Sequence, residues 1–272
     1  MAKTKRIISE QLKVVDVVVE VVDARIPYSS RNPDLPGLIG EKTLVLAMTK
    51  IDLADPRITQ EWLDHWRREG QDVVALNLTS GQGARPLRAL LERIADGVAN
   101  RMRQRGRQPR PLRILVAGVP NVGKSSLINR LAGKAKARVG AKAGVTRGKQ
   151  WVRVGNKMLI LDTPGILWPK FEDPQVAFGL AVTGAVSDEV FDWQQVTVRL
   201  VEYLCEAYPE TLPTYYKLKE ELPPTAVEVI EAIGRRRGLL MSGGRVDFEK
   251  AARLILQDFR SGKLGPMSLD QP

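Results

Sequence analysis

The segment from Gly118 to Ser125, GVPNVGKS, has the residue types and spacing of a phosphate-binding loop. It matches G-x-x-x-x-G-K-[ST] and stands between a short apolar run, residues 112–117, and a helical pattern that reaches about Leu131. Glycines in such a loop let backbone N–H groups point at phosphate oxygens, and the helix N-terminus adds partial positive charge. In this motif Lys124 reaches the β- and γ-phosphates of a nucleotide, and the Ser125 hydroxyl binds Mg²⁺.

Two later segments fit the same nucleotide site. Asp162 begins the sequence D-T-P-G at the end of a strand-like run, where an aspartate suits the Mg²⁺-binding Walker-B role. Gly165 ends that sequence and has no Cβ, so its backbone can approach a γ-phosphate. Thr146 lies between the two motifs and fits a switch that coordinates Mg²⁺ and senses the γ-phosphate. The predicted Mg²⁺ ligands are therefore Ser125, Thr146 and Asp162, with Lys124 and Gly165 as phosphate-stabilising residues.

Thr49-Lys50-Ile51-Asp52 resembles the N-K-x-D motif of GTPases, with Thr49 in place of the asparagine. In that motif the carboxylate, here Asp52, accepts hydrogen bonds from N1–H and the exocyclic amine of guanine, and the lysine stem packs over the base. Adenine offers no such pair and would leave a buried carboxylate unpaired, at a cost of roughly 1–3 kcal/mol or more. The motif therefore predicts GTP rather than ATP.

The order of these motifs along the chain is unusual. Base recognition lies near residue 50 and the phosphate loop near residue 120, whereas ordinary GTPases have the reverse order. The sequence therefore resembles a circularly permuted GTPase. Permutation is tolerated because domain termini often lie close together and surface loops can be reopened.

Strands and helices that would position these motifs alternate along the first part of the chain. Apolar, β-branched runs predict strands at residues 14–22, 43–48, 72–78, 112–117, 150–154 and 157–162, with helices at 58–69 and 84–100. This alternation predicts an α/β fold with a mostly parallel sheet that is covered on both faces. In the tail, helical spacing of apolar residues predicts helices at 194–207, 225–233 and 247–260. The predicted domains are residues 1–172 and an all-helical domain of residues 173–272.

Composition limits the classes of function. The chain has 42 Lys and Arg against 31 Asp and Glu, a net charge of +11, which favours a nucleic-acid partner. Its single cysteine, Cys205, excludes an internal disulfide, and its single histidine, His65, excludes a multi-histidine metal site. No apolar run approaches the roughly 20 residues that cross a bilayer, and the N-terminus lacks the apolar core of a signal peptide. We therefore expect a cytoplasmic protein with no membrane partner.

Positive charge is concentrated in three places. Residues 101–113 hold six arginines and no acidic residue, and we interpret them as an exposed basic linker. Residues 134–149 form a second basic segment, without acidic residues, after the phosphate loop. Arg235, Arg236 and Arg237 form the clearest cluster in the helical tail. The linker and the tail cluster either contact RNA or are solvated surface without a binding role.

Asp23-Ala24-Arg25-Ile26-Pro27 resembles the D-A-R-x-P signature of the YlqF/YawG family of circularly permuted GTPases. The segments LDTPGILWPKF, which starts at Leu161, and MSGG, which starts at Met241, resemble the same family, and the resemblance covers essentially the whole chain. It implies a GTP-hydrolysing factor for the late assembly of the large (50S) ribosomal subunit that contacts ribosomal RNA. We expect a monomer.

The resemblance also implies roles for individual residues. Phosphates are expected to contact Asn121, Val122, Gly123, Lys124, Ser125, Ser126 and Gly165. Asn77 and Leu78 lie where the second guanine-contacting segment of the family falls, and Leu78 replaces a usual serine, which leaves only backbone contacts. Asn121 resembles the asparagine that binds K⁺ in potassium-stimulated GTPases, where the cation neutralises developing charge. The alternative is an asparagine tolerated for its turn geometry.

Catalysis is the least defined part of the prediction. Ile166 and Leu167 follow D-T-P-G, which excludes the glutamine that orients water in many GTPases. The resembled family uses a histidine in an N-terminal W-F-P-G-H-M segment, and this sequence starts at the position of the final Met. The catalytic histidine is therefore absent from this sequence, either because the true start lies further upstream or because the chain is naturally short and hydrolyses GTP slowly. We interpret His65 as a structural or surface residue.

These features predict slow hydrolysis that large subunits and K⁺ stimulate. The main alternative is a non-catalytic or very slow RNA-binding scaffold in which GTP only sets the conformation. An RNA-modification GTPase is disfavoured because the sequence holds no second catalytic constellation.

Overall fold

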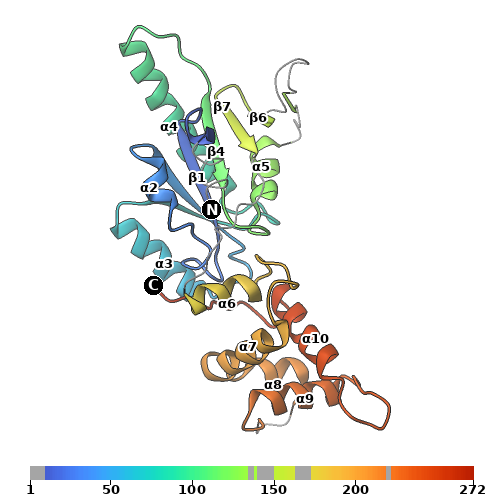
Figure 1. Cartoon of the computed structure of the whole chain (residues 1–272). Helices are drawn as coiled ribbons and strands as arrows, with labels where there is room; N and C mark the ends of the chain where they lie inside the picture. Colours follow the sequence, from blue (N-terminus) through green and yellow to red (C-terminus); the bar gives the residue numbers. More distant parts are fainter. Residues whose placement is uncertain (1–9, 134–137, 140–149, 163–172, 219–221) are drawn as a thin grey trace. The chain divides into compact units, whose positions relative to one another are not determined.

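The computed structural model describes residues 10–133, 138–139, 150–162, 173–218 and 222–272 (Figure 1). The chain divides into two units. The first is Met1–Glu172 together with Ser268–Pro272, and the second is Asp173–Met267. The last five residues, which the sequence analysis assigns to the helical domain, therefore belong to the first unit. None of the helices in the described ranges is long and apolar enough to cross a membrane.

A sheet with the strand order β3-β2-β1-β4-β7-β6-β5 forms the centre of the first unit. The strands that pair in parallel are β1 (Val17–Asp23), β2 (Thr43–Thr49), β3 (Asp72–Leu76), β4 (Leu112–Ala117) and β7 (Met158–Asp162). The antiparallel strands are β6 (Gln150–Val154) and β5 (Arg138–Val139). The prediction of a mostly parallel sheet is confirmed.

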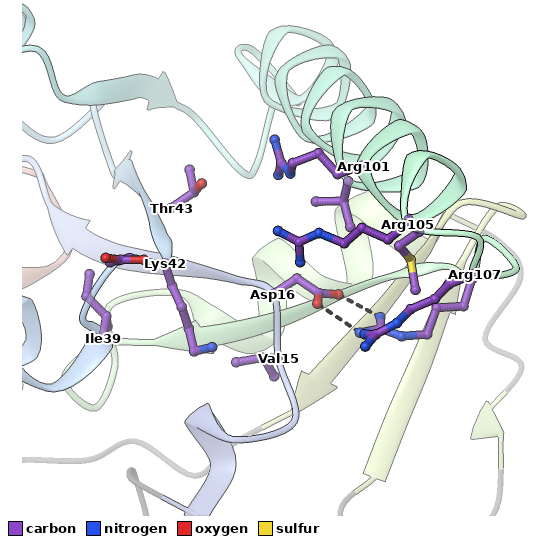
Figure 2. Close-up of a pocket in the computed structure, with 12 residues that line it drawn as sticks. Val15, Asp16, Ile39, Lys42, Thr43, Arg101, Arg105 and Arg107 are labelled. Atoms are coloured by element: carbon purple, nitrogen blue, oxygen red, sulfur yellow. Dashed lines mark hydrogen bonds and ion pairs between the residues drawn. The ribbon is translucent and has the colours of Figure 1, made fainter.

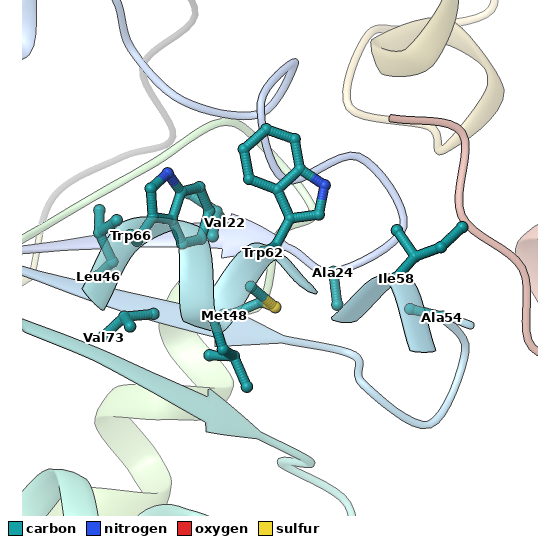
Figure 3. Packing of buried hydrophobic residues seen from close by; sticks show 10 residues of the cluster. Val22, Ala24, Leu46, Met48, Ala54, Ile58, Trp62, Trp66 and Val73 are labelled. Atoms are coloured by element: carbon teal, nitrogen blue, oxygen red, sulfur yellow. The ribbon is translucent and has the colours of Figure 1, made fainter. Parts of the chain in front are cut away.

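Helices cover both faces of this sheet. They are α2 (Leu35–Ile39), α3 (Pro56–Arg68), α4 (Ala84–Gln104) and α5 (Lys124–Ala132). Figure 3 shows Trp62 and Trp66 of α3 packed over Leu46 and Met48 of β2. Successive side chains of a strand point to opposite faces, yet all seven residues of β1 are buried, so the face away from α3 is covered as well. Helices α4 and α5 contact β4 and each other there.

The basic linker is shorter than predicted. Helix α4 continues to Gln104 and β4 begins at Leu112, so only residues 105–111 lie outside regular structure. Arg and Gln are good helix formers, so they extend the helix, and Gly106, with φ of 68°, follows its end instead of interrupting it. Four residues of the predicted linker, 101–104, are therefore helical.

The second unit consists of helices. They are α6 (Pro174–Val182), α7 (Trp193–Ala207), α8 (Thr211–Tyr216), α9 (Ala226–Arg236) and α10 (Phe248–Arg260). Side-chain caps begin most of them, including a capping box between Thr225 and Glu228 at α9. Helices α6 and α8 were not predicted from the sequence. Helix α6 is apolar around its circumference, so it has no helical periodicity, and α8 has only six residues.

The end of the chain is bound to the loop after β1. The Asp270 carboxylate accepts hydrogen bonds from the Ser29 backbone N–H at 2.7 Å and from its hydroxyl at 2.9 Å. The Leu269 backbone N–H donates to the Arg25 carbonyl at 2.7 Å. These bonds explain why the final residues belong to the first unit.

Candidate nucleotide site

The segments that resemble GTPase motifs all follow strands that run in parallel. D-A-R-x-P follows β1, T-K-I-D follows β2, residues 77–80 follow β3, and the phosphate loop follows β4. Because parallel strands end at the same edge of a sheet, the four segments lie at one edge. Ligands of open α/β sheets bind outside such carboxyl ends.

The phosphate loop has a backbone that requires glycine. Gly118 has φ of 149°, and a Cβ there would lie 2.5 Å from the Val21 carbonyl oxygen. Gly123 has φ of 104° and precedes α5 with no side-chain cap, and the N-terminus of a helix is a favourable site for an anion. Lys124 is buried and its Nζ donates to the Val119 carbonyl at 2.6 Å, which holds the ammonium group over the loop.

The residues predicted to hold Mg²⁺ are only partly described. Ser125 is exposed on the first turn of α5, and Asp162 is the last residue of β7, whose Leu161 pairs with Leu115 of β4. Asp162 therefore reaches the edge at which the phosphate loop starts, and its backbone position suits an oxygen ligand of the kind that Mg²⁺ prefers. Thr146 and Gly165 lie outside the described residues. Within the described parts of the chain, no three His, Cys, Asp or Glu residues group as a metal site.

Thr49 connects the guanine motif to the phosphate loop. Its Oγ1 lies 2.6 Å from the Val122 carbonyl oxygen and 3.0 Å from that of Val22, and the side chain is fully buried. Thr49 was predicted to be a nucleotide-binding residue of the guanine motif, although it departs from the asparagine of the family pattern. The structure gives it a role, because its hydroxyl fixes the end of β2 against the loop.

Lys50 is held in an unusual backbone conformation by Asp23. Lys50 has φ of 59°, and its Nζ lies 2.9 Å from Asp23 Oδ2. Asp23 also accepts hydrogen bonds from three nitrogens of Arg25: the backbone N at 3.1 Å, Nε at 3.0 Å and Nη2 at 2.8 Å. Burial alone would raise the pKa of Asp23, but the charges and hydrogen bonds of Arg25 and Lys50 hold it well below its usual range. The carboxylate therefore stays ionised.

D-A-R-x-P was predicted only as a family signature, and its contact with Lys50 was not predicted. The charged residues Asp and Arg at the end of a buried strand were the available signal, because buried charges are paired.

The segment after β3 is fixed from α5. Asn77 Oδ1 accepts hydrogen bonds from the backbone N–H groups of Thr79 and Ser80 at 2.9 and 3.0 Å. Arg130, which the sequence analysis did not identify, donates to the carbonyls of Leu78 and Thr79. A Cβ placed on Gly123 would lie 3.1 Å from Leu78 Cδ1 and 3.7 Å from Thr49 Oγ1.

The guanine motif at Thr49, the segment after β3 at Leu78 and the phosphate loop thus meet at Gly123. Asp52 is exposed beside them, in the turn after Lys50.

His65 lies elsewhere, on α3. Its Nε2 is 3.4 Å from Glu69 Oε1, and its ring stands edge-on to that of Trp62. These contacts, with residues of the same helix and its C-cap, agree with the interpretation of His65 as a structural or surface residue.

The tail cluster of the second unit is partly engaged in structural contacts. Arg235 pairs with Glu231 at 3.3 Å, and the Arg237 guanidinium lies 5.1 Å from the centroid of the Tyr216 ring. Arg236 is exposed and has no such contact within the described part of the chain. Within the described residues, Arg236 is therefore the member of the cluster with neither an acidic nor an aromatic partner.

Comparison with known proteins identifies the family. A family model described as 50S ribosome-binding GTPase matches residues 113–207. Ribosome biogenesis GTPase A of Priestia megaterium is 45% identical over 273 aligned residues, which cover 100% of this chain and 94% of the relative. Ribosome biogenesis GTPase A of Thermotoga maritima is 32% identical and covers 99% of this chain and 91% of its own.

Solved structures agree with this similarity. A GDP-bound YlqF structure has a TM-score of 0.70 at 29% identity and covers 98% of this chain and 99% of its own. A GNP-bound YlqF from T. maritima has a TM-score of 0.69 at 29% identity, with 99% and 98% covered. The predicted fold class, a circularly permuted GTPase domain with a mostly parallel sheet, is confirmed. The chain therefore belongs to the ribosome biogenesis GTPase A family and is a GTP-hydrolysing enzyme of ribosome biogenesis.

Proposed function

We propose that this GTPase promotes the late maturation of the large (50S) ribosomal subunit, binds ribosomal RNA, and acts as a cytoplasmic monomer. The observation that carries the nucleotide part is the meeting of three segments at Gly123, where Thr49 and Leu78 lie beside the phosphate loop. The names of the relatives and the description of the family model support the ribosomal part. The net charge of +11 supports an RNA partner.

In this proposal the base and the phosphates are bound from different strands. Asp52 accepts the guanine hydrogen bonds, and Lys50 packs over the base from the conformation that Asp23 imposes. Asn77 and Leu78 line the base with backbone groups. The residues assigned to the phosphates are Asn121, Val122, Gly123, Lys124, Ser125, Ser126 and Gly165.

Two cations complete the proposed chemistry. Mg²⁺, bound by Ser125, Thr146 and Asp162, would neutralise charge that develops on the β- and γ-phosphates. K⁺ beside Asn121 would add positive charge near the same oxygens. Asn121 has φ of 58°, a conformation that asparagine tolerates better than most residues, so turn geometry accounts for its presence equally well. Only a comparison of K⁺ with Na⁺ separates these two explanations.

We also propose that the helical unit contributes to RNA binding through the Arg235–Arg237 cluster. Arg236 is the residue of choice for a test, because Arg235 and Arg237 have partners inside the unit. Arg236→Glu should weaken RNA binding and its salt dependence without loss of helicity. Unchanged binding would assign the cluster to solvated surface.

The experiment that tests the proposed function is single-turnover release of phosphate from GTP by the full chain. It is run alone, with purified large subunits, and with small subunits as the matched control, each in K⁺ and in Na⁺. The proposal expects slow release alone and faster release with large subunits in K⁺. Equal release under all conditions would refute the role of the large subunit, and binding to large subunits without faster release would favour a GTP-dependent scaffold.

A further inference from the structure

A basic pocket lies at the opposite edge of the sheet from the nucleotide site. It has a volume of about 530 Å³ and is bounded by the starts of β1 and β2, the segment after α2, and the end of α4 with the residues that follow it. Its basic lining residues are Lys42, Arg101, Arg105, Arg107 and Arg110. Figure 2 shows Arg101 and Arg105 extending from α4 toward the side on which Asp16 and Thr43 lie.

This pocket cannot be part of the nucleotide site. Strands β1 and β2 begin beside the pocket, near Val17 and Thr43, and end at the nucleotide edge with Asp23 and Thr49. Each strand has seven residues, which span about 20 Å at roughly 3.3 Å per residue. A ligand in the pocket therefore leaves the GTP site free.

The linker is folded so that its arginines face the pocket. The Arg107 N–H donates to the Met102 carbonyl at 2.9 Å, and the Gly106 N–H donates to the Arg103 carbonyl at 2.9 Å. With φ of 68° at Gly106, these bonds form a Schellman-type turn that brings Arg107 back over the end of α4.

A partly buried ion pair fixes the other end of the linker. Asp16 binds both terminal nitrogens of Arg110, at 2.7 and 2.9 Å, and accepts the Arg113 backbone N–H at 2.9 Å. Burial opposes ionisation of Asp16, but these bonds outweigh it and lower its pKa. The Asp16 carboxylate is thus already neutralised by Arg110.

The remaining cations have no such partner. Within the described residues, Lys42, Arg101, Arg105 and Arg107 form no ion pair, and Glu41 is the only other acidic group of the lining. The negative end of the α4 dipole accounts for cations in its last turn, at about 0.3–1 kcal/mol each. It does not account for Lys42, which comes from a different element, or for Arg107, which lies beyond the helix. Four cations that converge from two sides indicate an anionic ligand.

The lining also indicates which anion. It contains no aromatic side chain, so it offers no aromatic platform for a nucleobase, and its polar groups are five cations, the Thr43 hydroxyl and the carboxylates of Asp16 and Glu41. Guanidinium and ammonium groups without a stacking platform match phosphate oxygens. Several cations spread over this volume match more than one phosphate.

We propose that the pocket binds consecutive phosphates of an RNA backbone, independently of the base sequence and of the bound guanine nucleotide. The choice of RNA among polyanions rests on the proposed function, because the RNA in reach of a large-subunit factor is ribosomal.

The test uses the full chain and two variants with equal loss of charge. The pocket variant carries Arg101→Gln, Arg105→Gln and Arg107→Gln, all at exposed positions. The control variant carries Arg67→Gln, Arg88→Gln and Arg93→Gln, three exposed arginines of the same unit that pair with Asp64, Glu92 and Asp72. Binding of a mixed-sequence single-stranded RNA is measured over a range of salt concentrations, and GTP hydrolysis verifies that each variant is folded.

The pocket variant should lose up to about 100-fold in RNA affinity near 0.1 M salt, because removing three phosphate contacts lowers the salt slope by about 2. The control variant should remain within a few-fold of the parent, and GDP or GTP should change neither result. Equal affinity of the pocket variant and the parent overturns the proposal, as does an equal loss in both variants.

Two further probes separate the sources of the anion. The pocket substitutions could abolish tripolyphosphate binding and leave RNA affinity unchanged. That result would assign the pocket to free polyphosphate and overturn the RNA assignment. If the substitutions instead abolish binding to anionic phosphatidylglycerol vesicles and leave RNA affinity unchanged, the pocket would be assigned to a lipid surface, and the RNA assignment would again be overturned. The parent could fail to bind large subunits while the pocket substitutions still lower the affinity for free RNA. In that case the proposed function is refuted, but the proposal that the pocket binds RNA is supported.

Discussion

The substitution Asp23→Asn tests how the guanine motif is positioned. Asp23 accepts hydrogen bonds from three nitrogens of Arg25 and from Lys50 Nζ, all between 2.8 and 3.1 Å. Asparagine keeps the shape of the side chain but removes its charge and one acceptor oxygen. Two cations are then left at a buried neutral amide, and Lys50 loses the contact that holds its φ at 59°.

Two separate magnitudes follow. Removal of one partner of a buried ion pair costs about 3–5 kcal/mol of unfolding free energy. The left-handed conformation of a residue with a Cβ costs about 1–2 kcal/mol, which nucleotide binding must supply once Asp23 no longer does. GTP and GDP should therefore each bind about 5- to 30-fold more weakly. The two losses should be equal, because both nucleotides carry the same base.

The assay is equilibrium binding of fluorescent GDP and GTP analogues, at a temperature where thermal unfolding shows the variant to be folded. Asp16→Asn is the matched control, because Asp16 is also paired with an arginine but lies at the far edge of the sheet. It should lose stability without losing nucleotide affinity.

Unchanged nucleotide affinity of folded Asp23→Asn would refute the positioning role. So would an equal loss of affinity in the Asp16→Asn control, because it would assign the effect to stability alone.

Four further outcomes are expected. Thr49→Val leaves the Val122 carbonyl unpaired and should cost about 1–3 kcal/mol in urea unfolding, with Thr49→Ser much closer to the parent. Gly123→Ala should weaken GTP binding, because it adds backbone strain of about 1–2 kcal/mol at positive φ and places a Cβ near Leu78. The control is Gly133→Ala, which also has positive φ (64°) but would have no atom within 4 Å of its Cβ, so it should lower stability without lowering GTP affinity. Asp270→Asn replaces a carboxylate that accepts two bonds from Ser29 and should lower the melting temperature measured by circular dichroism. The pKa of Asp23 is lowered in the folded state, so its stabilisation is present above the unfolded value of 3.8 and is lost as pH falls below it. In acid unfolding the parent should therefore lose more stability than Asp23→Asn between about pH 4 and pH 2.

The sequence predicted those features that depend on local pattern. The strands of the parallel sheet carry apolar runs, which are longest and most β-branched in β1, and the phosphate loop is one contiguous motif, so both could be located by type and spacing. The end of α4 was placed too early because glycine and prolines nearby suggested a break, whereas Gly106 follows the helix end. Helix α6 was missed because it has no polar face.

Positioning contacts could not be predicted in the same way, because they join residues that are distant in sequence. Thr49 reaches a carbonyl 73 residues away, and Arg130 reaches one 52 residues away. Each donor is an ordinary residue type, and only the parallel packing of β2, β3 and β4 brings it to its acceptor. Motifs therefore identified the groups for nucleotide chemistry, and the structure supplied the groups that orient them.

The end of the chain contacts the segments on both sides of the guanine motif, T-K-I-D. Leu269 binds the carbonyl of Arg25, whose side chain holds Asp23, and the Ser268 hydroxyl accepts the backbone N–H of Asp55 at 3.2 Å. Asp55 caps α3, the helix that follows T-K-I-D. Residues 268–270 therefore support the guanine motif on both flanks, from the loop after β1 and from the start of α3. The base-recognition segment T-K-I-D precedes the phosphate loop in this chain, and residues 268–270 stabilise the segments on both sides of it.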